Sequence, residues 1–182
     1  DAFRVGEDGP THEPVEQEAQ IRLMEKLHNH SGRPSVMVLR PADAEETTTA
    51  WKMAMENIYT PTALILSRQD VASVPNTSAE GVKKGAYIVS KDENPQVVMI
   101  ASGSEVSTLM AGAELLRAEG VRLQIVSVPS EAIFRQQSKE YQAEVLPQGV
   151  ARFGLTAGLP CNLEGLVGEH GTVWGLNSFG FS

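Results

Sequence analysis

The sequence predicts an α/β fold in which mostly parallel strands alternate with helices. Segments 35–39 and 62–66 are short continuous apolar runs separated by a helical pattern, which is typical of parallel strands covered on both faces. A similar alternation resumes near residue 85, and helical connections between strands favour parallel pairing. We therefore expect two α/β units, a first unit in residues 1–78 and a second unit in residues 79–182.

Composition limits the class of protein. The chain has 182 residues, of which 41% are hydrophobic, and this is enough to bury a core. A formal net charge of -8 argues against broad binding to nucleic acids or anionic membranes, and no apolar run approaches the roughly 18 residues of a membrane span. The single cysteine, Cys161, excludes an internal disulfide framework. We expect a soluble cytoplasmic protein that binds small molecules or other proteins.

The first unit is predicted to contain helix, strand, helix and strand. Residues 13–30 form the first helix, because apolar side chains recur at helical spacing. Its predicted buried face consists of Val15, Ala19, Leu23 and Leu27. Strand 35–39 follows, and Asp43 with Glu46 has the pattern of a capping box that starts the next helix. The predicted buried stripe of that helix is Trp51, Ala54, Met55 and Ile58, and strand 62–66 completes the unit.

The second unit follows a polar stretch, residues 67–84, which we interpret as a linker because it is rich in small residues. The apolar pattern restarts at GAYIVS, and strands are predicted in QVVMIASG, VRLQIVSVP and ARFGLTAG. The segment SEVSTLMAGAELLRAEG predicts a helix that ends at Gly120. Its apolar face comprises Val106, Leu109, Met110, Ala113 and Leu116. One or two short helices are predicted before the last strand.

Both ends of the sequence have the character of interior segments. The first unit starts in the loop before a helix and contains only two predicted strands, too few for an independent sheet. The second unit stops directly after NSFGFS, without a polar tail or a capping helix. We therefore expect the chain to be part of a longer protein, with most of the missing part upstream.

Three places are candidates for chemistry, because ligands of an open parallel sheet bind in loops beyond the carboxyl ends of strands. The first is the opening loop GEDGPTHEP, which contains Glu7, Asp8 and His12. Pro14 would start the following helix, and the helix dipole would favour a neutral His12 that exchanges hydrogen bonds with hydroxyl groups. A capping loop with solvated charges is the simpler alternative, since Asp-Gly-Pro is common in turns.

The second place is SRQD, where Arg68 follows a predicted strand by two residues. Its guanidinium is suited to a two-pronged contact with a phosphate or carboxylate. A surface salt bridge to Asp70 is the simpler alternative. Arg40 follows the other strand of the unit, and there Pro41 favours a structural turn.

The third place is ASGSEV, a strand that leads through a glycine turn into a helix opened by Ser104. An anion can bind at such a helix start, but the segment lacks the further glycines or the lysine of known phosphate-binding motifs. An N-cap formed by Ser104, or by Ser102 with Glu105, is the simpler alternative.

The remaining histidines and the cysteine give weaker signals. His28 and His30 fall at a predicted helix end, where positive charge complements the dipole. His170 lies in a turn-like segment, and Cys161 has no neighbouring histidine or basic residue in the sequence. We assign none of them a catalytic role.

Five motifs together resemble transketolase. They are GEDGPTHEP, LRPADAEET, PTALILSRQ, IASGSEV and VSVPS, which occur in this order and at the family's spacings across essentially all 182 residues. The resemblance implies that residues 1–78 are the end of a thiamine-diphosphate-binding-type α/β domain, the pyrimidine-binding domain. It implies that residues 79–182 are a smaller three-layer α/β C-terminal domain with a mostly parallel sheet. Deoxyxylulose phosphate synthase and pyruvate dehydrogenase-type subunits share this architecture but match the motifs less well.

The resemblance implies a parent enzyme that transfers a two-carbon ketol unit from a ketose phosphate to an aldose phosphate in the pentose phosphate pathway. That enzyme would be a homodimer that uses thiamine diphosphate and a divalent metal, Mg²⁺ or Ca²⁺. In the family, the aspartate and histidine of GEDGPTH line the substrate channel, which implies substrate contacts for Asp8 and His12. The arginine of SRQ binds the distal phosphate of the sugar, and this role falls on Arg68.

The resemblance also implies what these residues lack. The family's catalytic glutamate, metal ligands and diphosphate-binding loop belong to sequence upstream, so we expect no complete catalytic set, no bound cofactor and no turnover from residues 1–182 alone. Family THQP is THEP here, so Glu13 replaces an amide without removing the site. The alternative function is a non-catalytic dimerisation module or a regulatory module that binds an anion at Ser104.

Overall fold

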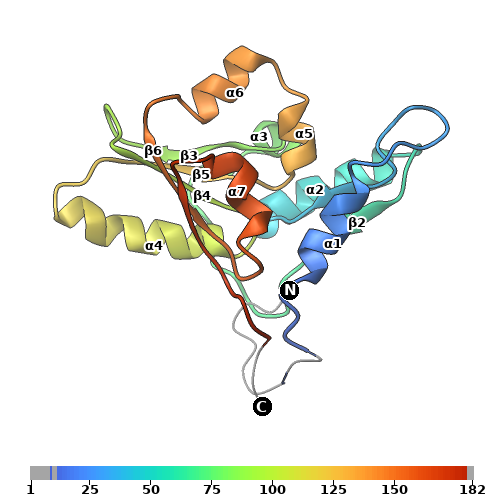
Figure 1. Cartoon of the computed structure of the whole chain (residues 1–182), viewed down its shortest axis with the longest axis horizontal. Coiled ribbons are helices and arrows are strands. Elements are labelled where there is room, and N and C mark those ends of the chain that lie inside the picture. The colour runs from blue at the N-terminus through green and yellow to red at the C-terminus, as the bar shows by residue number, and fades with distance from the viewer. Residues whose placement is uncertain (1–8, 10–11, 180–182) are drawn as a thin grey trace.

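Two sheets of different size organise the chain (Figure 1), which the computed structural model describes at residue 9 and over residues 12–179. The first unit contains, in order, α1 (Gln17–Met24), β1 (Met37–Leu39), α2 (Ala44–Glu56) and β2 (Thr62–Leu64). The second unit contains α3 (Ala79–Lys83), β3 (Tyr87–Lys91), β4 (Val97–Ala101), α4 (Glu105–Ala118), β5 (Leu123–Ser127), α5 (Glu131–Arg135), α6 (Lys139–Val145), β6 (Ala151–Leu155), α7 (Cys161–Val167) and β7 (Thr172–Trp174). The predicted α/β class is confirmed.

The small sheet consists of β1 and β2, which pair in parallel with Met37 opposite Thr62 and Leu39 opposite Leu64. Each strand is two residues shorter than its predicted segment. The helix α2 connects the two strands, so the prediction of a parallel pair joined by a helix is confirmed. Because the strands are parallel, their carboxyl ends lie at the same edge of the sheet.

The large sheet has the strand order β3-β5-β4-β6-β7 and is parallel except for β3, which runs antiparallel to β5 at one edge. Side chains of β4 alternate between two cores: Met99 packs on the face that α4 covers, and Ile100 packs on the face that α5 and α7 cover. Figure 1 shows these helices on opposite sides of the sheet. The second unit is thus the predicted three-layer arrangement, and β7 and the antiparallel pairing of β3 are additions to it.

The helix α4 behaves as predicted. Its side chains Val106, Leu109 and Ala113 are buried in the core. The helix ends where Gly120 adopts φ +84°, a left-handed conformation that favours glycine. The Gly120 N–H donates to the carbonyl of Arg117, and the next N–H donates to the carbonyl of Leu116, the two hydrogen bonds of a Schellman motif.

The predicted helix over residues 13–30 is wrong in extent. α1 spans Gln17–Met24 and begins three residues after Pro14, so the proline does not start it. Beyond Met24 the chain turns back on itself, because the Asn29 side chain accepts hydrogen bonds from the backbone of Ser31 and Arg33, and His28 pairs with Pro34. This turn chemistry overrides the helical periodicity. The helix-dipole argument for His28 and His30 therefore does not apply.

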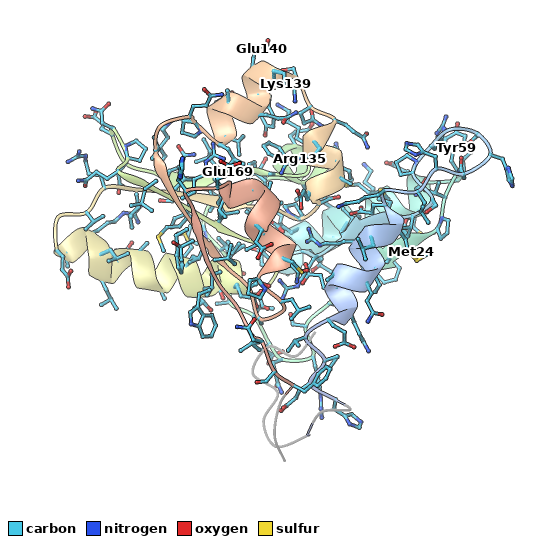
Figure 2. All side chains as sticks on the ribbon, viewed as in Figure 1. Met24, Tyr59, Arg135, Lys139, Glu140 and Glu169 are labelled. Carbon is cyan, nitrogen blue, oxygen red and sulfur yellow. The ribbon has the colours of Figure 1, made fainter. Side chains whose placement is uncertain are left out.

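The predicted buried faces of the first two helices are largely exposed. Leu23, Leu27, Trp51, Met55 and Ile58 are 51–81% exposed, whereas α2 buries Glu46, Thr49 and Ala50. The α2 helix turns a polar side toward the second unit, and its apolar side faces outward in the part of the chain that the structure describes. Met24 and Tyr59, which are labelled in Figure 2, are also exposed, at 51% and 59%.

The predicted linker, residues 67–84, is more ordered than expected. Ser78 caps α3 through a hydrogen bond to Gly81 N, so the stretch ends in a helix. Val74 is 4% exposed, and its N–H donates to Asp43 Oδ2 at 2.9 Å. The stretch is therefore fastened to the start of α2. The boundary between residues 78 and 79 stays a prediction.

No helix in the described part of the chain has the length and apolar character to cross a membrane.

Candidate substrate-binding site

The loop that carries His12 is fixed by backbone hydrogen bonds within the loop and from the second unit. The N–H groups of His12 and Glu13 donate to the carbonyl of Gly9 at 3.2 and 3.1 Å. Gly9 has φ +73°, which only glycine adopts without strain. The N–H of Leu159, before α7, donates to the carbonyl of Val15 at 3.1 Å. The second unit therefore helps to position the loop before α1.

The described residues include only part of the predicted loop site. Glu7 and Asp8 lie outside the described residues, so the predicted role of Asp8 stays a prediction. The His12 side chain is exposed, and Glu13 is 9% exposed. Since α1 begins at Gln17 and the helix dipole acts mainly within the first turn, the expected influence of the dipole on His12 is not supported.

The second predicted residue, Arg68, is exposed and follows β2, which ends at Leu64. Arg40 directly follows β1, and its Nε lies 3.5 Å from Glu18 Oε2 in α1. Arg68 therefore lies in the segment beyond the carboxyl end of β2, and the Arg40–Glu18 contact places α1 beside the carboxyl end of β1. That His12 and Arg68 meet in one site stays a prediction.

Arg40 is a buried ionic link between the two units, so its role is structural, as predicted, and it acts through ion pairs that the sequence did not indicate. The side chain is 1% exposed. Its Nη1 donates to Glu105 Oε2 at 2.5 Å and to the carbonyl of Ser102. Burial acts to lower the pKa of Arg40, but the carboxylates of Glu18 and Glu105 outweigh burial, so this pKa lies above its ordinary value. The guanidinium therefore remains charged inside the protein.

The third predicted place, the start of α4, is filled by the chain itself. Ser104 is fully buried and forms no side-chain cap, and its hydroxyl donates to Glu105 Oε1 at 2.8 Å. Gly103 has φ +68°, and a Cβ there would lie 2.8 Å from Arg40 Cγ. Ser104 is the N-cap residue of α4, as expected, but its hydroxyl bonds to Glu105 instead of capping the helix. An external anion at Ser104 finds no support, because Ser104 is fully buried and Arg40 lies beside Gly103.

A second buried carboxylate, Glu46, also links the units. Its Oε1 accepts hydrogen bonds from the hydroxyls of Ser127 at 2.6 Å and Tyr87 at 2.7 Å. Its Oε2 accepts from Ala42 N at 2.7 Å, and its own N–H donates to Asp43 Oδ1 at 3.0 Å. The predicted start of α2 at Asp43 is confirmed, and Glu46 has the additional task of binding β3 and β5.

We predict that Glu46→Gln changes the pH dependence of stability. Burial raises the pKa of Glu46, although the hydrogen bonds partly offset this effect. A carboxyl whose pKa rises on folding contributes fully to stability below its unfolded pKa of 4.5, and this contribution is lost as pH rises through the folded value. The wild type should therefore lose stability relative to Glu46→Gln as pH increases above 4.5, measured by urea unfolding across a pH series. Glu119→Gln, on an exposed carboxyl, is the control, and a constant difference between wild type and Glu46→Gln would contradict the prediction.

Sequence reasoning missed Arg22, which joins α1 to the second unit, and Glu18, which pairs with Arg22 and Arg40. Arg22 pairs with Glu18 at 2.8 Å and donates to the hydroxyl of Ser102 at 3.2 Å. Helical periodicity assigns both to the solvent side of α1, so no local signal distinguishes them from ordinary surface charges.

The structure also places Cys161 in the wall of a cavity with Lys26 and His28, although the sequence around Cys161 holds no base.

A divalent metal has no ready site in the described residues. Within residue 9 and residues 12–179, no three histidine, cysteine, aspartate or glutamate side chains are arranged to hold a metal ion. The described residues therefore do not fit the metal that would accompany thiamine diphosphate.

These features define a class of protein: a mostly parallel α/β protein of two units, in which the second unit supports the loop before α1 through the bond from Leu159 to Val15. Residues 1–73 match the family described as the transketolase pyrimidine binding domain. Residues 85–182 match the transketolase-like TK C-terminal domain. The chain belongs to the transketolase family, and the resemblance noted in the sequence is confirmed.

Individual relatives agree with this assignment. The chain is 43% identical over its whole length to transketolases of Geobacillus stearothermophilus and Bacillus subtilis (strain 168), and it covers 27% of each. A Pichia stipitis transketolase in complex with sedoheptulose-7-phosphate matches the whole chain with a TM-score of 0.88 and 34% identity, over 25% of that structure. Leishmania mexicana transketolase matches 98% of the chain with a TM-score of 0.86 and 40% identity, again over 25% of that structure. The chain thus spans about a quarter of the length of these relatives.

Proposed function

We propose that this chain is part of a transketolase that transfers a two-carbon ketol unit from a ketose phosphate to an aldose phosphate. The observation that carries the proposal is the match of both transketolase domains, in order, along one chain. The Pichia stipitis relative was solved with a sugar phosphate, sedoheptulose-7-phosphate. We assign sugar phosphates as substrates, a homodimer as the assembly and the cytoplasm as the location of the parent enzyme.

The proposed roles follow from the chemistry of each side chain. Arg68 offers an exposed guanidinium beyond the end of β2, suited to a charge-assisted contact with the distal phosphate of the sugar. His12 and Asp8 would contact hydroxyl groups near the reacting carbons. The hydrogen bond from Leu159 to Val15 supports this loop from the second unit, so residues 79–182 would act as a positioning domain.

Thiamine diphosphate would supply the group that stabilises the carbanion formed from the ketose. We assign the side chains that hold this cofactor and its metal, Mg²⁺ or Ca²⁺, to other parts of the parent enzyme, because the chain spans about a quarter of the length of its relatives. The role of the chain is therefore to orient the sugar and its charge. Residues 1–182 alone are expected to show no turnover.

A turnover assay tests the proposal. The full-length protein with thiamine diphosphate and Mg²⁺ should transfer the ketol unit from xylulose 5-phosphate to ribose 5-phosphate. Absence of transfer from a folded, cofactor-saturated protein would overturn the assignment. Cross-linking or sedimentation of the same material would establish whether it is a dimer.

We predict that His12→Ala lowers kcat by roughly two- to tenfold, as expected when one hydrogen bond of about 0.5–1.5 kcal/mol to a hydroxyl group is lost at the reacting end. The loss should be similar for phosphorylated and unphosphorylated acceptors, because His12 would not contact the phosphate. His170→Ala, on an exposed histidine in the loop before β7, is the matched control. A defect restricted to phosphorylated acceptors would reassign His12 to phosphate binding.

A further inference from the structure

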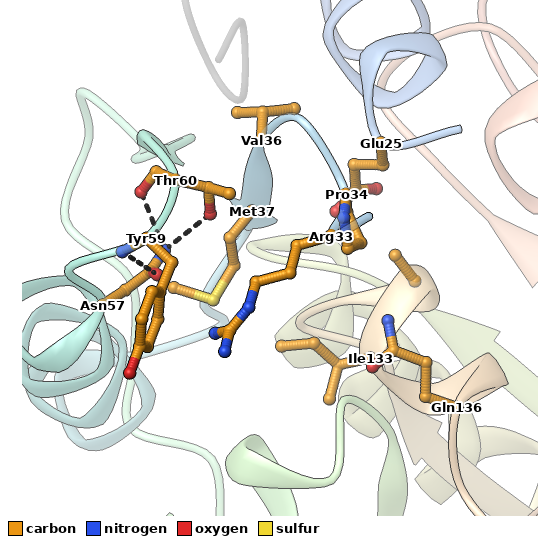
Figure 3. Close-up of a pocket in the computed structure, with 11 residues that line it drawn as sticks. Glu25, Arg33, Pro34, Val36, Met37, Asn57, Tyr59, Thr60, Ile133 and Gln136 are labelled. Atoms are coloured by element: carbon orange, nitrogen blue, oxygen red, sulfur yellow. Dashed lines mark hydrogen bonds between the residues drawn. The ribbon is translucent and has the colours of Figure 1, made fainter. Parts of the chain in front are cut away.

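A cavity of about 520 Å³ lies at the seam between the two units, lined by α1 and the turn after it on one side and by α5 and the start of α7 on the other. A smaller cavity of about 300 Å³ adjoins it (Figure 3). The two cavities share Glu25, Pro34, Ala132 and Gln136. Neither His12 nor Arg68 lines them, so the residues proposed for substrate binding do not account for this space.

The charge of the lining is opposite to that of the whole chain. The formal net charge of the chain is -8. The permanently charged cations that line the two cavities are Arg22, Lys26, Arg33 and Arg135, and the carboxylates are Glu25 and Glu131. His28 also lines the larger cavity and can add positive charge. A concave surface with low-dielectric walls concentrates the electric field of the charges that line it. The seam therefore attracts anions, although the protein as a whole repels them.

Arg22 lacks hydrogen-bond acceptors on part of its guanidinium. The side chain is 10% exposed, and its Nη2 is bound to Glu18 and Ser102. Its Nε and Nη1 find no acceptor within the described chain, since Glu131 Oε2 lies 3.9 Å from Nη1. Buried donors in native proteins are nearly always satisfied. Arg22 therefore keeps positive charge at the cavity wall that hydrogen bonds within the chain only partly compensate.

The other cations differ in how far they are neutralised. Arg135 is bound to Glu131 at 3.0 Å, which leaves that arginine partly compensated. Lys26 is exposed on the cavity wall, and no described carboxylate lies within 4.0 Å of its ammonium. Arg33 stacks on the ring of Tyr59, 3.5 Å from the ring centre, in the adjoining cavity (Figure 3). Lys26 is therefore the cation best placed to gain an anionic partner.

We propose that the seam cavity binds a small phosphorylated metabolite, with the phosphate facing Arg22, Lys26 and Arg135. The volume suits a small molecule and is too small for a protein segment. The adjoining cavity, with Met37 and Ile133 in its wall, receives the body of the ligand. Because the lining comes from both units, the bound molecule strengthens their packing and raises the stability of the folded protein.

Titration of the full-length protein tests this site. The protein carries Arg68→Ala, so that the proposed contact with substrate phosphate is absent, and the probes are inorganic phosphate and glycerol 3-phosphate at constant ionic strength. Isothermal titration should show saturable binding of both probes, with tighter binding of glycerol 3-phosphate. Adding Lys26→Glu should weaken both by about tenfold or more, as expected from losing a charge-assisted contact.

The matched control is Lys139→Glu, which makes the same charge change on exposed α6, outside both cavities (Figure 2). It should leave both affinities unchanged. Equal weakening by Lys26→Glu and Lys139→Glu would show a general charge effect and overturn the site, as would the absence of saturable phosphate binding. Arg135→Gln should give a partial loss, because Glu131 already neutralises part of its charge. Binding is measured without turnover, so a protein that fails the ketol-transfer assay still tests the seam cavity.

Discussion

Arg40→Ala is expected to lower the free energy of unfolding by about 3–5 kcal/mol, the loss typical of removing one partner from a buried ion pair. The substitution leaves Glu105, which is 4% exposed, without its cation, and it leaves Glu18 without one of two nearby arginines. It also removes the side chain that fills the space beside Gly103. Equilibrium urea unfolding measures the effect. Because Arg40 braces α1 and the loop before it, kcat should fall as well.

Two further variants separate the ion pair from a general loss of arginine. Arg122→Ala removes an exposed arginine bound to the carbonyl of Asn94, and surface changes of this kind cost within about 1 kcal/mol. Glu105→Ala and the double variant complete a cycle whose coupling energy should reach about 1–3 kcal/mol. A loss for Arg40→Ala no larger than that for Arg122→Ala would mean that desolvation cancels the attraction of the pair.

Arg68→Ala in the full-length enzyme should raise KM for phosphorylated sugars by about one to two orders of magnitude. This corresponds to the loss of a charge-assisted contact of about 1.5–3 kcal/mol. Acceptors without a phosphate should be affected little, since the proposed contact is absent from them. Initial rates with paired phosphorylated and unphosphorylated acceptors measure the difference. An equal loss for both acceptor types would refute the phosphate role, and Arg122→Ala again serves as the arginine control.

Local patterns predicted the second unit well, because the apolar faces of its helices and strands pack against one another within the chain. The apolar face of α4 was read correctly from Val106, Leu109 and Ala113, since a periodic face packed on a neighbouring sheet is what the pattern encodes. Gly120 likewise stops the helix through a local backbone preference. Such features depend on residues close in sequence, so the sequence alone is sufficient to locate them.

The first unit shows where periodicity fails. The pattern of Trp51, Met55 and Ile58 indicates an apolar face but does not say which surface covers it, and these residues are exposed in the described structure. The helix predicted over residues 13–30 is too long. The apolar spacing continues past its end, but hydrogen bonds to the Asn29 side chain form a turn there. Periodicity identifies which face of a helix is apolar. Whether that face is buried depends on the elements that pack against it in the folded protein.

The candidate site divides in the same way. His12 and Arg68 could be proposed from the sequence because they belong to recognisable motifs on loops, where ligand-binding residues concentrate. The ion pair of Arg40 could not be predicted, because its partner Glu105 lies 65 positions away and no residue near Arg40 in the sequence indicates a buried charge. The cations at the seam were missed for the same reason, since Lys26 and Arg135 approach one cavity only in the folded chain.

The links made by Arg40 and Glu46 bear on how the chain responds to proteolysis. The small sheet has two described strands and is held to the second unit by side chains that are 65 and 81 positions from their partners. Residues 68–70, between the sheets, are exposed and open to a protease. A cut there would sever the covalent connection but leave these buried contacts in place. The two pieces should therefore stay associated and separate only when the protein unfolds.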